Sequence, residues 1–311
     1  MPRRPFRFAI QTSNAPSAEA WRTKAKRIEE LGFSTLLMPD HFGDQLSPVP
    51  AFMAAADATS TLRVGGLVLD NDFKHPYVLA KEIATLDVLT GGRVELGIGA
   101  GWMVTDYEQS GIPYDEPAVR VRKLKESVAV MKGLFGEGPF SFEGKHYTIT
   151  NANGLPKPVQ QPHPPIMIGG GGKQVLRFAA READIISVNF NLREGAVGAS
   201  TMATGTAEAT ADKIGWIKDA AGARYDDIEL NVTIFVTIVT DDAAKMAERV
   251  AAGFGTTPEE LPKAPHALIG SVDQIVDELQ RRRDEYGFSY VAFSGDVFEQ
   301  VAPIVAKLAG K

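Results

Sequence analysis

Two adjacent polar side chains, Asp40 and His41, are the pair in this sequence best suited to proton transfer. They follow the apolar run Thr35–Met38, so they are expected just past the carboxyl end of a buried strand. An imidazole titrates near neutral pH, and a neighbouring carboxylate raises its basicity or fixes its orientation. The pair therefore indicates general acid–base chemistry. A local role, in which the two side chains only bond to the backbone of their own loop, is the alternative.

A second candidate site is the run of four glycines from Gly169 to Gly172. The run follows the apolar residues 165–168 and precedes a helical pattern that begins near Val175. Glycines at a helix N-terminus expose backbone N–H groups, which suit a phosphate. A flexible turn is the alternative, but four glycines are an entropically costly way to make one. The run therefore favours a phosphate site.

Three glycines near the middle of the chain, Gly97, Gly99 and Gly101, look like part of a dinucleotide-binding fingerprint. Such a fingerprint opens directly into a helix and has an acidic residue roughly 20 positions further on. Here residues 102–117 are polar and turn-rich, and no suitable strand follows. We interpret the small residues as allowing a flat ligand or a second backbone segment to approach the strand end. For Gly97, simple tight packing of neighbouring strands is the alternative.

The sequence contains no pattern for covalent or metal catalysis. It has no cysteine, and none of its five histidines is spaced as a metal-ligand pair with another, so no metal site is expected. It has no nucleophile elbow and no Walker loop, and its close carboxylates Asp70 and Asp72 lie on one short loop. Because no side chain carries a hydride reversibly, the remaining groups, with the aromatic Trp102 and Tyr107, favour a bound redox cofactor.

The elements that must position these residues alternate between strands and helices. Each apolar run ends at polar or turn-forming residues, as strands buried on both faces of a parallel sheet do. Eight such strands predict an α/β fold of the (β/α)₈ TIM barrel type, with an open doubly wound sheet as the weaker alternative. The predicted strands are Phe6–Gln11, Ser34–Met38, Arg63–Leu69, Arg93–Ile98, Pro165–Gly169, Asp184–Val188, Ile228–Val239 and Ser289–Phe293. The predicted helices are Ala18–Leu31, Pro76–Thr90, one carrying Val121 to Phe135, one beginning with a capping box at Ser271 and Gln274, and a last one opened by Asp296.

Four segments interrupt the alternation and are predicted to be insertions at the carboxyl face of a single domain that covers residues 1–311. They lie at about 100–119, 136–161, 189–206 and 253–266. Residues 140–149 are expected to form a hairpin, and residues 193–206 a mobile loop. Long insertions after barrel strands cluster over the active face and often act as lids.

The bulk composition restricts the partners. The formal net charge of −6 has no long run of one sign, which argues against nucleic acid and against an anionic membrane surface. No apolar segment is long enough to cross a bilayer, and no signal-peptide core follows the first basic residues. The absence of cysteine fits a reducing compartment. We therefore expect a cytoplasmic protein with a small-molecule substrate.

Taken in order, these motifs resemble the bacterial-luciferase-like superfamily of flavin- and deazaflavin-dependent oxidoreductases, over essentially the full chain. The most specific of them is the run Arg-Val-Glu-Leu-Gly-Ile-Gly-Ala-Gly-Trp at residues 93–102. The Asp40–His41 pair resembles enzymes that use coenzyme F420, whereas many FMN-dependent members carry Glu-His-His at this point. The other matching runs are 39–42, 65–68, 165–172 and 179–184.

The resemblance implies an F420 ring at the carboxyl mouth of the barrel, with FMN as the alternative cofactor. His41 and Asp40 would be the catalytic residues, with Trp102 and Tyr107 shaping the substrate pocket. The family often has a non-proline cis peptide in the third strand, and Leu67–Val68 is the matching bond here. The cofactor-binding residues would be Asp40, Leu67, Val68, Asp70, Ala100, Gly101, Thr105, Gly171, Gly172, Gln174 and Val175.

One residue departs from part of the family. The sugar-phosphate dehydrogenases of this group have a glutamate where this chain has Trp102, so their substrate and two-residue proton chemistry are not carried over. The resemblance then implies an F420-dependent oxidoreductase that passes a hydride between the deazaflavin and an alcohol, an aldehyde or an activated alkene. The alternatives are an FMN-dependent monooxygenase and a non-catalytic cofactor-binding protein. Relatives are commonly homodimers, so a homodimer is expected.

Overall fold

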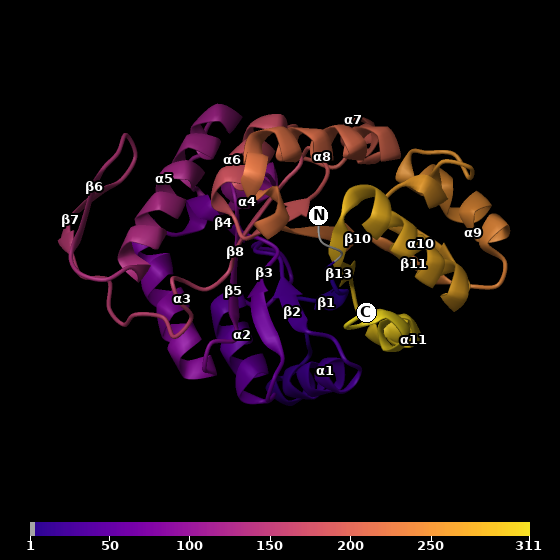
Figure 1. Ribbon diagram of the computed structural model, residues 1–311, viewed down its shortest axis with the longest axis horizontal. Helices are drawn as coiled ribbons and strands as arrows, with labels where there is room; N and C mark the ends of the chain where they lie inside the picture. The colour runs from indigo at the N-terminus through magenta and orange to yellow at the C-terminus, as the bar shows by residue number, and fades with distance from the viewer. Residues whose placement is uncertain (1–3) are drawn as a thin grey trace.

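Parallel strands close into a barrel at the centre of the molecule, in a computed structural model that describes residues 4–311 (Figure 1). The strand order is β3-β2-β1-β13-β10-β9-β8-β5-β4, and a further pairing of β3 with β5 closes the ring. The predicted eight-stranded (β/α)₈ barrel is therefore confirmed. The barrel strands are β1 (Arg7–Gln11), β2 (Thr35–Met38), β3 (Arg63–Gly66), β4 (Leu69–Asp70), β5 (Val94–Gly99), β8 (Ile166–Gly170), β9 (Ile185–Val188), β10 (Glu229–Ile234) and β13 (Phe288–Ser294).

Strands β3 and β4 belong to one predicted strand, which is interrupted at Leu67–Val68. The peptide bond between these two residues is cis, as expected. Glycines allow the neighbouring strands to approach closely here. A Cβ on Gly97 would lie 1.8 Å from the carbonyl oxygen of Gly66, so Gly97 is required for strand packing. This result supports the structural interpretation of Gly97.

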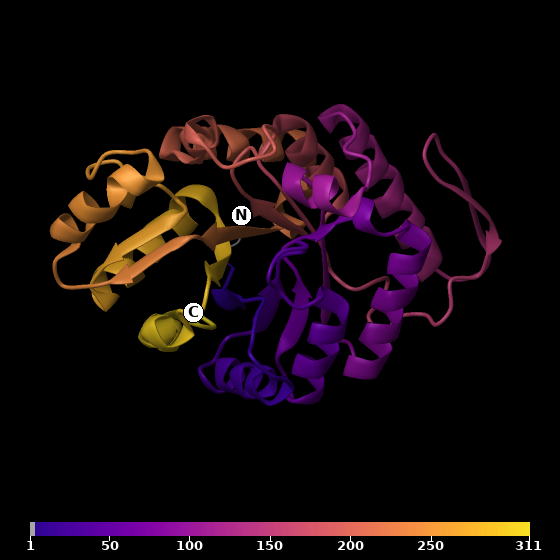
Figure 2. The same cartoon turned by 180° about the vertical axis from the view of Figure 1, so that it is seen from behind.

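Helices surround the barrel and cover the outer faces of its strands (Figures 1 and 2). The expected capping box at the start of α10 is present: Ser271 accepts from Gln274 N–H, and the Gln274 side chain accepts from Ser271 N–H. Helix α3 ends at Gly91, whose φ of 66° suits glycine. The helices are α1 (Ala18–Glu30), α2 (Pro48–Asp57), α3 (Pro76–Thr90), α4 (Val104–Ser110), α5 (Pro117–Phe135), α6 (Lys173–Glu182), α7 (Ala199–Met202), α8 (Ala207–Ala221), α9 (Ala243–Val250), α10 (Val272–Tyr286) and α11 (Phe298–Leu308).

The hairpin predicted within residues 136–161 is present, but it does not follow a barrel strand. Its strands β6 (Phe140–Glu143) and β7 (Thr148–Ala152) pair antiparallel in the connection from α5 to β8. Figures 1 and 2 both show the hairpin at the edge of the molecule, outside α5. Because this connection leaves a helix and enters a strand, it returns to the amino end of the barrel, and it is not a lid over the carboxyl face.

The predicted strand Ile228–Val239 is two strands. It breaks at Phe235, whose N–H donates to the carbonyl of His266. Beyond this break β11 (Val236–Val239) leaves the barrel and pairs parallel with β12 (Ala267–Gly270), which the sequence did not indicate. Helix α9 and the segment 253–266 join these two strands and lie on the opposite side of the molecule from the β6–β7 hairpin (Figure 1).

Two further local expectations need correction. Asp296 does not cap the last helix, which begins at Phe298; its carboxylate instead accepts from Thr12 Oγ1 and Lys24 Nζ. The segment 193–206 is not only loop, because it contains α7 and a 3-10 turn. The first difference arises from contacts with a distant part of the chain, which local sequence patterns do not encode.

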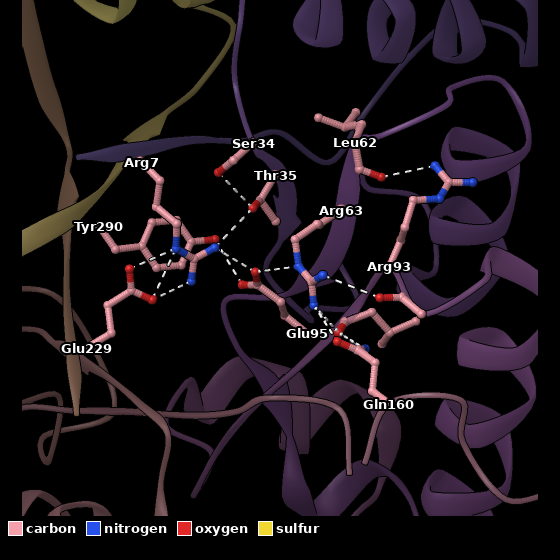
Figure 3. Close-up of polar contacts among 12 residues, drawn as sticks. Arg7, Ser34, Thr35, Leu62, Arg63, Arg93, Glu95, Gln160, Glu229 and Tyr290 are labelled. Atoms are coloured by element: carbon pink, nitrogen blue, oxygen red, sulfur yellow. Dashed lines mark hydrogen bonds and ion pairs between the residues drawn. The ribbon is translucent and has the colours of Figure 1, made fainter. Parts of the chain in front are cut away.

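Charged side chains fill the barrel interior at the amino ends of the strands (Figure 3). The guanidinium of Arg7 lies between Glu95 at 2.6 Å and Glu229 at 2.6 Å, and it stacks over the ring of Tyr290. Arg63 donates to the same Glu95 carboxylate at 2.9 Å. Each buried charge therefore has an oppositely charged partner, as a stable interior requires.

Candidate active site

A cavity of about 550 Å³ opens at the carboxyl end of the barrel. This is where enzymes of this architecture bind their ligands, and the volume suits a cofactor or a substrate of moderate size. The walls come from the ends of the barrel strands and from the starts of helices α5 and α6. Its lining includes the predicted residues Asp40, His41, Leu67, Val68, Asp70, Ala100, Gly101, Trp102, Gly171, Gly172, Gln174 and Val175.

Two predicted residues lie away from this cavity. Thr105 is exposed on α4 and does not line it. Tyr107 is buried beneath the wall, where its hydroxyl contacts acidic side chains, and it does not face the cavity space directly. The expectation that Thr105 lies along a cofactor and that Tyr107 shapes the substrate pocket therefore has no support from their positions.

His41 is held by a carboxylate that the sequence did not indicate. Its Nδ1 lies 2.7 Å from Oδ2 of Asp106, and the other Asp106 oxygen accepts from the Phe42 N–H at 3.2 Å. The Asp106 side chain is 5% exposed and that of His41 is 24% exposed. When Nδ1 carries the proton in this bond, Nε2 is left to bind a ligand. The edge of the imidazole also packs against Trp102, with ring centroids 5.7 Å apart.

Asp40, the expected partner of His41, has a different hydrogen bond. Its Oδ2 accepts from the backbone N–H of Asp70 at 3.2 Å, which connects the loop after β2 to the end of β4. Burial raises the pKa of Asp40. Asp40 therefore lines the cavity as a partly buried acid beside His41, while Asp106 fixes the imidazole.

Asp70 and Asp72 form a buried acidic group under the same wall. The Tyr107 hydroxyl lies 3.1 and 3.2 Å from the two oxygens of Asp70, and 3.3 Å from Oδ2 of Asp72. Burial raises the pKa of Asp70 to about 7, and the neighbouring Asp72 carboxylate contributes. Titratable groups perturbed in this way concentrate at functional sites.

The floor of the cavity contains Val68, between two glycines of the flanking strands. A Cβ on Gly99 would lie 2.6 Å from one Val68 methyl, and a Cβ on Gly169 would lie 2.9 Å from the other. The glycines thus leave room for a valine side chain that lines the cavity. Flat apolar surfaces of this kind suit a planar ring.

The glycine turn before α6 fits a phosphate. Gly172 is the N-cap of this helix, and no side chain caps the free N–H groups of the first turn. A Cβ on Gly171 would meet the Phe190 carbonyl oxygen at 2.2 Å, whereas a Cβ on Gly172 would find no atom nearer than 3.7 Å. Lys173 and Arg193 add positive charge to this part of the lining. The residues present therefore fit the phosphate of a flavin or deazaflavin cofactor.

The sequence interpretation missed Asp106, which contacts the cavity residue His41. Asp106 lies 65 positions from His41, in a segment that looked polar and irregular, and only its place in the first turn of α4 hints at a role. Residues 189–193 and 117–118, which belong to two of the predicted insertions, line the cavity. Within residues 4–311, no group of His, Asp and Glu side chains is arranged to hold a metal ion. In the same range no helix is long and apolar enough to span a membrane.

Fold and cavity together define a (β/α)₈ barrel protein with a candidate ligand site at the carboxyl ends of its strands. A family model described as luciferase-like monooxygenase matches residues 5–288, so the chain belongs to this family. The superfamily resemblance expected from the motifs is thereby confirmed.

This chain is similar to relatives that depend on two different cofactors. It is 32% identical over 180 residues to an FMNH(2)-dependent dimethylsulfone monooxygenase of Pseudomonas putida, covering 56% of this chain and 49% of that protein. It is also 32% identical over 168 residues to an F420-dependent glucose-6-phosphate dehydrogenase of Amycolatopsis mediterranei, covering 51% of this chain and 50% of that protein. The matches thus span about half the length of these relatives.

A solved structure shares the fold over the whole chain. An F420-dependent secondary alcohol dehydrogenase in complex with an F420-acetone adduct superposes with a TM-score of 0.78 at 17% identity, and 98% of each chain is covered. At this identity the likeness concerns the fold. Membership of a family of oxidoreductases and monooxygenases supports an enzyme, and its relatives use either F420 or FMN.

Proposed function

We propose that this protein is an F420-dependent oxidoreductase that transfers a hydride between the deazaflavin and a small organic substrate. The observation that carries the proposal is the His41–Asp106 pair at the cavity wall, 2.7 Å apart. It supplies a proton donor or acceptor whose orientation is fixed before the substrate arrives. A homodimer and a cytoplasmic location stay predictions from the sequence.

F420, when bound, supplies the two-electron hydride chemistry that no side chain provides. Asp106 holds Nδ1 of His41, which leaves Nε2 to take a proton from a substrate hydroxyl or to give one to a carbonyl oxygen. Trp102 packs against His41 and would border the substrate. The turn at Gly171 and Gly172 would hold the phosphate through backbone N–H groups.

An FMN-dependent monooxygenase is the second candidate function. Its support is the similarity to the FMNH(2)-dependent monooxygenase, which reaches the same identity as the similarity to the F420-dependent dehydrogenase. The phosphate turn is compatible with both cofactors. The Asp40–His41 sequence is the feature that favours F420 in our proposal.

The cofactor is tested by titrating the purified protein with F420 and with FMN, each oxidised and reduced, while following ligand fluorescence and absorbance. We expect saturable F420 binding that is at least tenfold tighter than FMN binding. Tight FMN binding with no F420 binding would overturn the proposal and favour the monooxygenase. A panel of alcohols, aldehydes and activated alkenes with both F420 redox states then identifies the substrate class.

The role of His41 is tested with His41→Ala. We expect F420 affinity to stay within about threefold of the unchanged protein, while kcat falls about 10²–10⁴-fold, the usual contribution of general acid–base catalysis. His163→Ala is the matched control, because His163 bonds to the Pro164 carbonyl and does not line the cavity. Unchanged turnover in His41→Ala would remove the proton-transfer assignment.

A further inference from the structure

Two buried carboxylates share one hydroxyl beneath the cavity wall. The Tyr107 oxygen lies within 3.3 Å of both Asp70 and Asp72, and the Tyr107 side chain is almost completely buried. A phenol carries one proton, so it donates to only one carboxylate at a time. The three groups therefore form a short line along which a proton can be transferred from one oxygen to the next without a large movement of any group.

The sequence leaves room for this arrangement at Gly101. A Cβ at this position would lie 1.9 Å from the Tyr107 oxygen and 2.7 Å from each Asp70 carboxylate oxygen. The φ of Gly101 is also +75°, a conformation that side chains with a Cβ rarely adopt. Any larger residue at position 101 would separate Tyr107 from Asp70.

Hydrogen bonds and one ion pair join the cavity to the outside of the barrel. At one end Asp70 lines the cavity. At the other end Asp72 lies 3.7 Å from Nζ of Lys123, which in turn pairs with Asp115 at 2.5 Å. The Lys123 and Asp115 side chains are 23% and 34% exposed, so solvent reaches this end.

We propose that Asp70 is a second proton-transfer group of the cavity, and that Tyr107 and Asp72 connect it to solvent. In the releasing direction an O–H or N–H bond of the bound ligand breaks and an O–H bond forms on Asp70. The Asp70 proton then passes to the Tyr107 oxygen as the Tyr107 proton passes to Asp72. Lys123 gives one N–H proton to solvent and takes the Asp72 proton in its place, so each bond that forms is matched by one that breaks. No group is oxidised or reduced in these steps. The inference rests on the proposed function only in requiring a ligand with an exchangeable proton.

Other charges act on this group from neighbouring elements. Asp40 accepts from the Asp70 N–H and is itself close to Lys74 and His41. The positive charge of Arg120 on α5 acts to lower the pKa values of Asp72 and Tyr107.

Burial raises the pKa of Asp70 to about 7, although the Asp72 N–H and the Tyr107 hydroxyl act in the opposite direction. A carboxyl group with this pKa can release and regain a proton near neutral pH. This fits the role of a proton-transfer group.

The first test observes the protein without cofactor, by ¹³C NMR of labelled aspartate carboxyl carbons during a pH titration. We expect one carboxyl signal with a midpoint near pH 7 that is missing in Asp70→Asn. In Tyr107→Phe the midpoint should move up, because the lost hydroxyl stabilised the carboxylate. Tyr225→Phe removes a partly buried hydroxyl elsewhere and should leave the midpoint unchanged. If no aspartate titrates above about pH 5.5, or if Tyr107→Phe leaves the midpoint unchanged, the inference is overturned.

The second test measures turnover of the F420-loaded protein. Tyr107 does not line the cavity, so Tyr107→Phe should lower kcat about tenfold, change KM less than twofold and alter the solvent deuterium isotope effect. Unchanged kcat and isotope effect would overturn the connection to solvent. Failure of F420 to bind overturns the proposed function instead, and the NMR titration distinguishes the two because it needs no cofactor. Should Asp70→Asn not fold, the comparison of Tyr107→Phe with the unchanged chain decides the matter.

Discussion

Glu95 near the amino end of the barrel and Asp70 at its carboxyl end are both buried carboxyl groups, yet their surroundings shift their pKa values in opposite directions. Burial opposes ionisation of Glu95, but the guanidinium groups of Arg7 and Arg63 outweigh it and lower the pKa (Figure 3). Burial raises the pKa of Asp70 to about 7, because its nearest partners are a hydroxyl and a backbone N–H, and no cation among residues 4–311 contacts it.

The difference separates the structural end of the barrel from the end that carries the candidate ligand cavity. At the amino end Arg7 and Arg63 are paired with Glu95 and Glu229, so these charges need no ligand to balance them. At the carboxyl end Asp40, Asp70 and Asp72 lie close together, Asp40 partly buried and the other two side chains buried, and loss of solvent raises the pKa of each. A fold keeps such a costly arrangement where it serves a function. Substitutions at the two ends should therefore have opposite effects on stability.

Glu95→Gln should give the largest effect. It leaves the Arg7 and Arg63 guanidinium groups without their shared carboxylate, and breaking a buried ion pair in this way costs about 3–5 kcal/mol. Urea unfolding at pH 7 measures the loss. Because the folded pKa of Glu95 is lowered, its stabilisation is present above the unfolded pKa and is lost as the pH falls through the folded one. The difference between the two proteins should shrink in strong acid.

Glu229→Gln is the matched control for this substitution. Glu229 also pairs with Arg7, but its side chain is 15% exposed against 2% for Glu95. Solvent compensates the more exposed group better, so the loss should be smaller. Equal losses at the two positions would contradict the view that the buried Glu95 organises the network.

Asp70→Asn should stabilise the protein at high pH. The folded pKa of about 7 lies above the unfolded value, so the contribution of Asp70 to stability is present in acid and is lost as the pH rises from about 4 through 7. Asparagine stays neutral throughout. The gain should be small at pH 4 and reach at most about 4 kcal/mol above pH 7. Unfolding curves at several pH values measure it, with the exposed Asp44→Asn as control, and destabilisation at pH 8 would contradict the comparison.

Much of the barrel and of the cavity could be predicted because the signals are local. Short apolar runs ending in polar residues mark buried parallel strands, and the carboxyl ends of such strands meet in a barrel. For this reason His41, Val68 and Gly172, which the sequence predicts to lie at one site, all line the same cavity. The capping box at Ser271 is local too, and it was found.

The features that the sequence patterns did not predict depend on side chains that meet only after folding. Asp106 reaches His41 across 65 positions, and no pattern in the sequence links them. Asp296 looked like a helix cap because its neighbours fit one, but Lys24, 272 positions away, competes for the carboxylate. The break at Phe235 likewise requires β12 as a partner outside the barrel. Tertiary contacts outweigh local preference in each case.

Substitutions in the glycine turn should have a smaller effect on stability, and they test whether the phosphate binds there. A methyl group in Gly171→Ala would collide with the Phe190 carbonyl, so we expect a loss of about 1–3 kcal/mol in unfolding free energy. In Gly172→Ala the methyl group has free space and the φ of −88° is ordinary, so the change should stay within about 0.5 kcal/mol. Both should weaken F420 binding in a fluorescence titration. If Gly172→Ala binds F420 normally, the phosphate does not lie at this turn.

The smallest expected effect distinguishes the two acids beside His41. Asp106→Asn removes the negative charge that holds the Nδ1 proton, so kcat should fall about tenfold with little change in KM, or about 1.4 kcal/mol in activation free energy. The ¹⁵N signals of the His41 ring should show a mixture of tautomers, which a purely structural loss would not produce. Asp40→Asn should leave the tautomer unchanged, because Asp40 bonds to the Asp70 N–H and not to the ring. The exposed Glu108→Gln on the same helix is the control. If Asp40→Asn redistributes the tautomers and Asp106→Asn does not, His41 is oriented by its sequence neighbour after all, and the distant contact has no catalytic role.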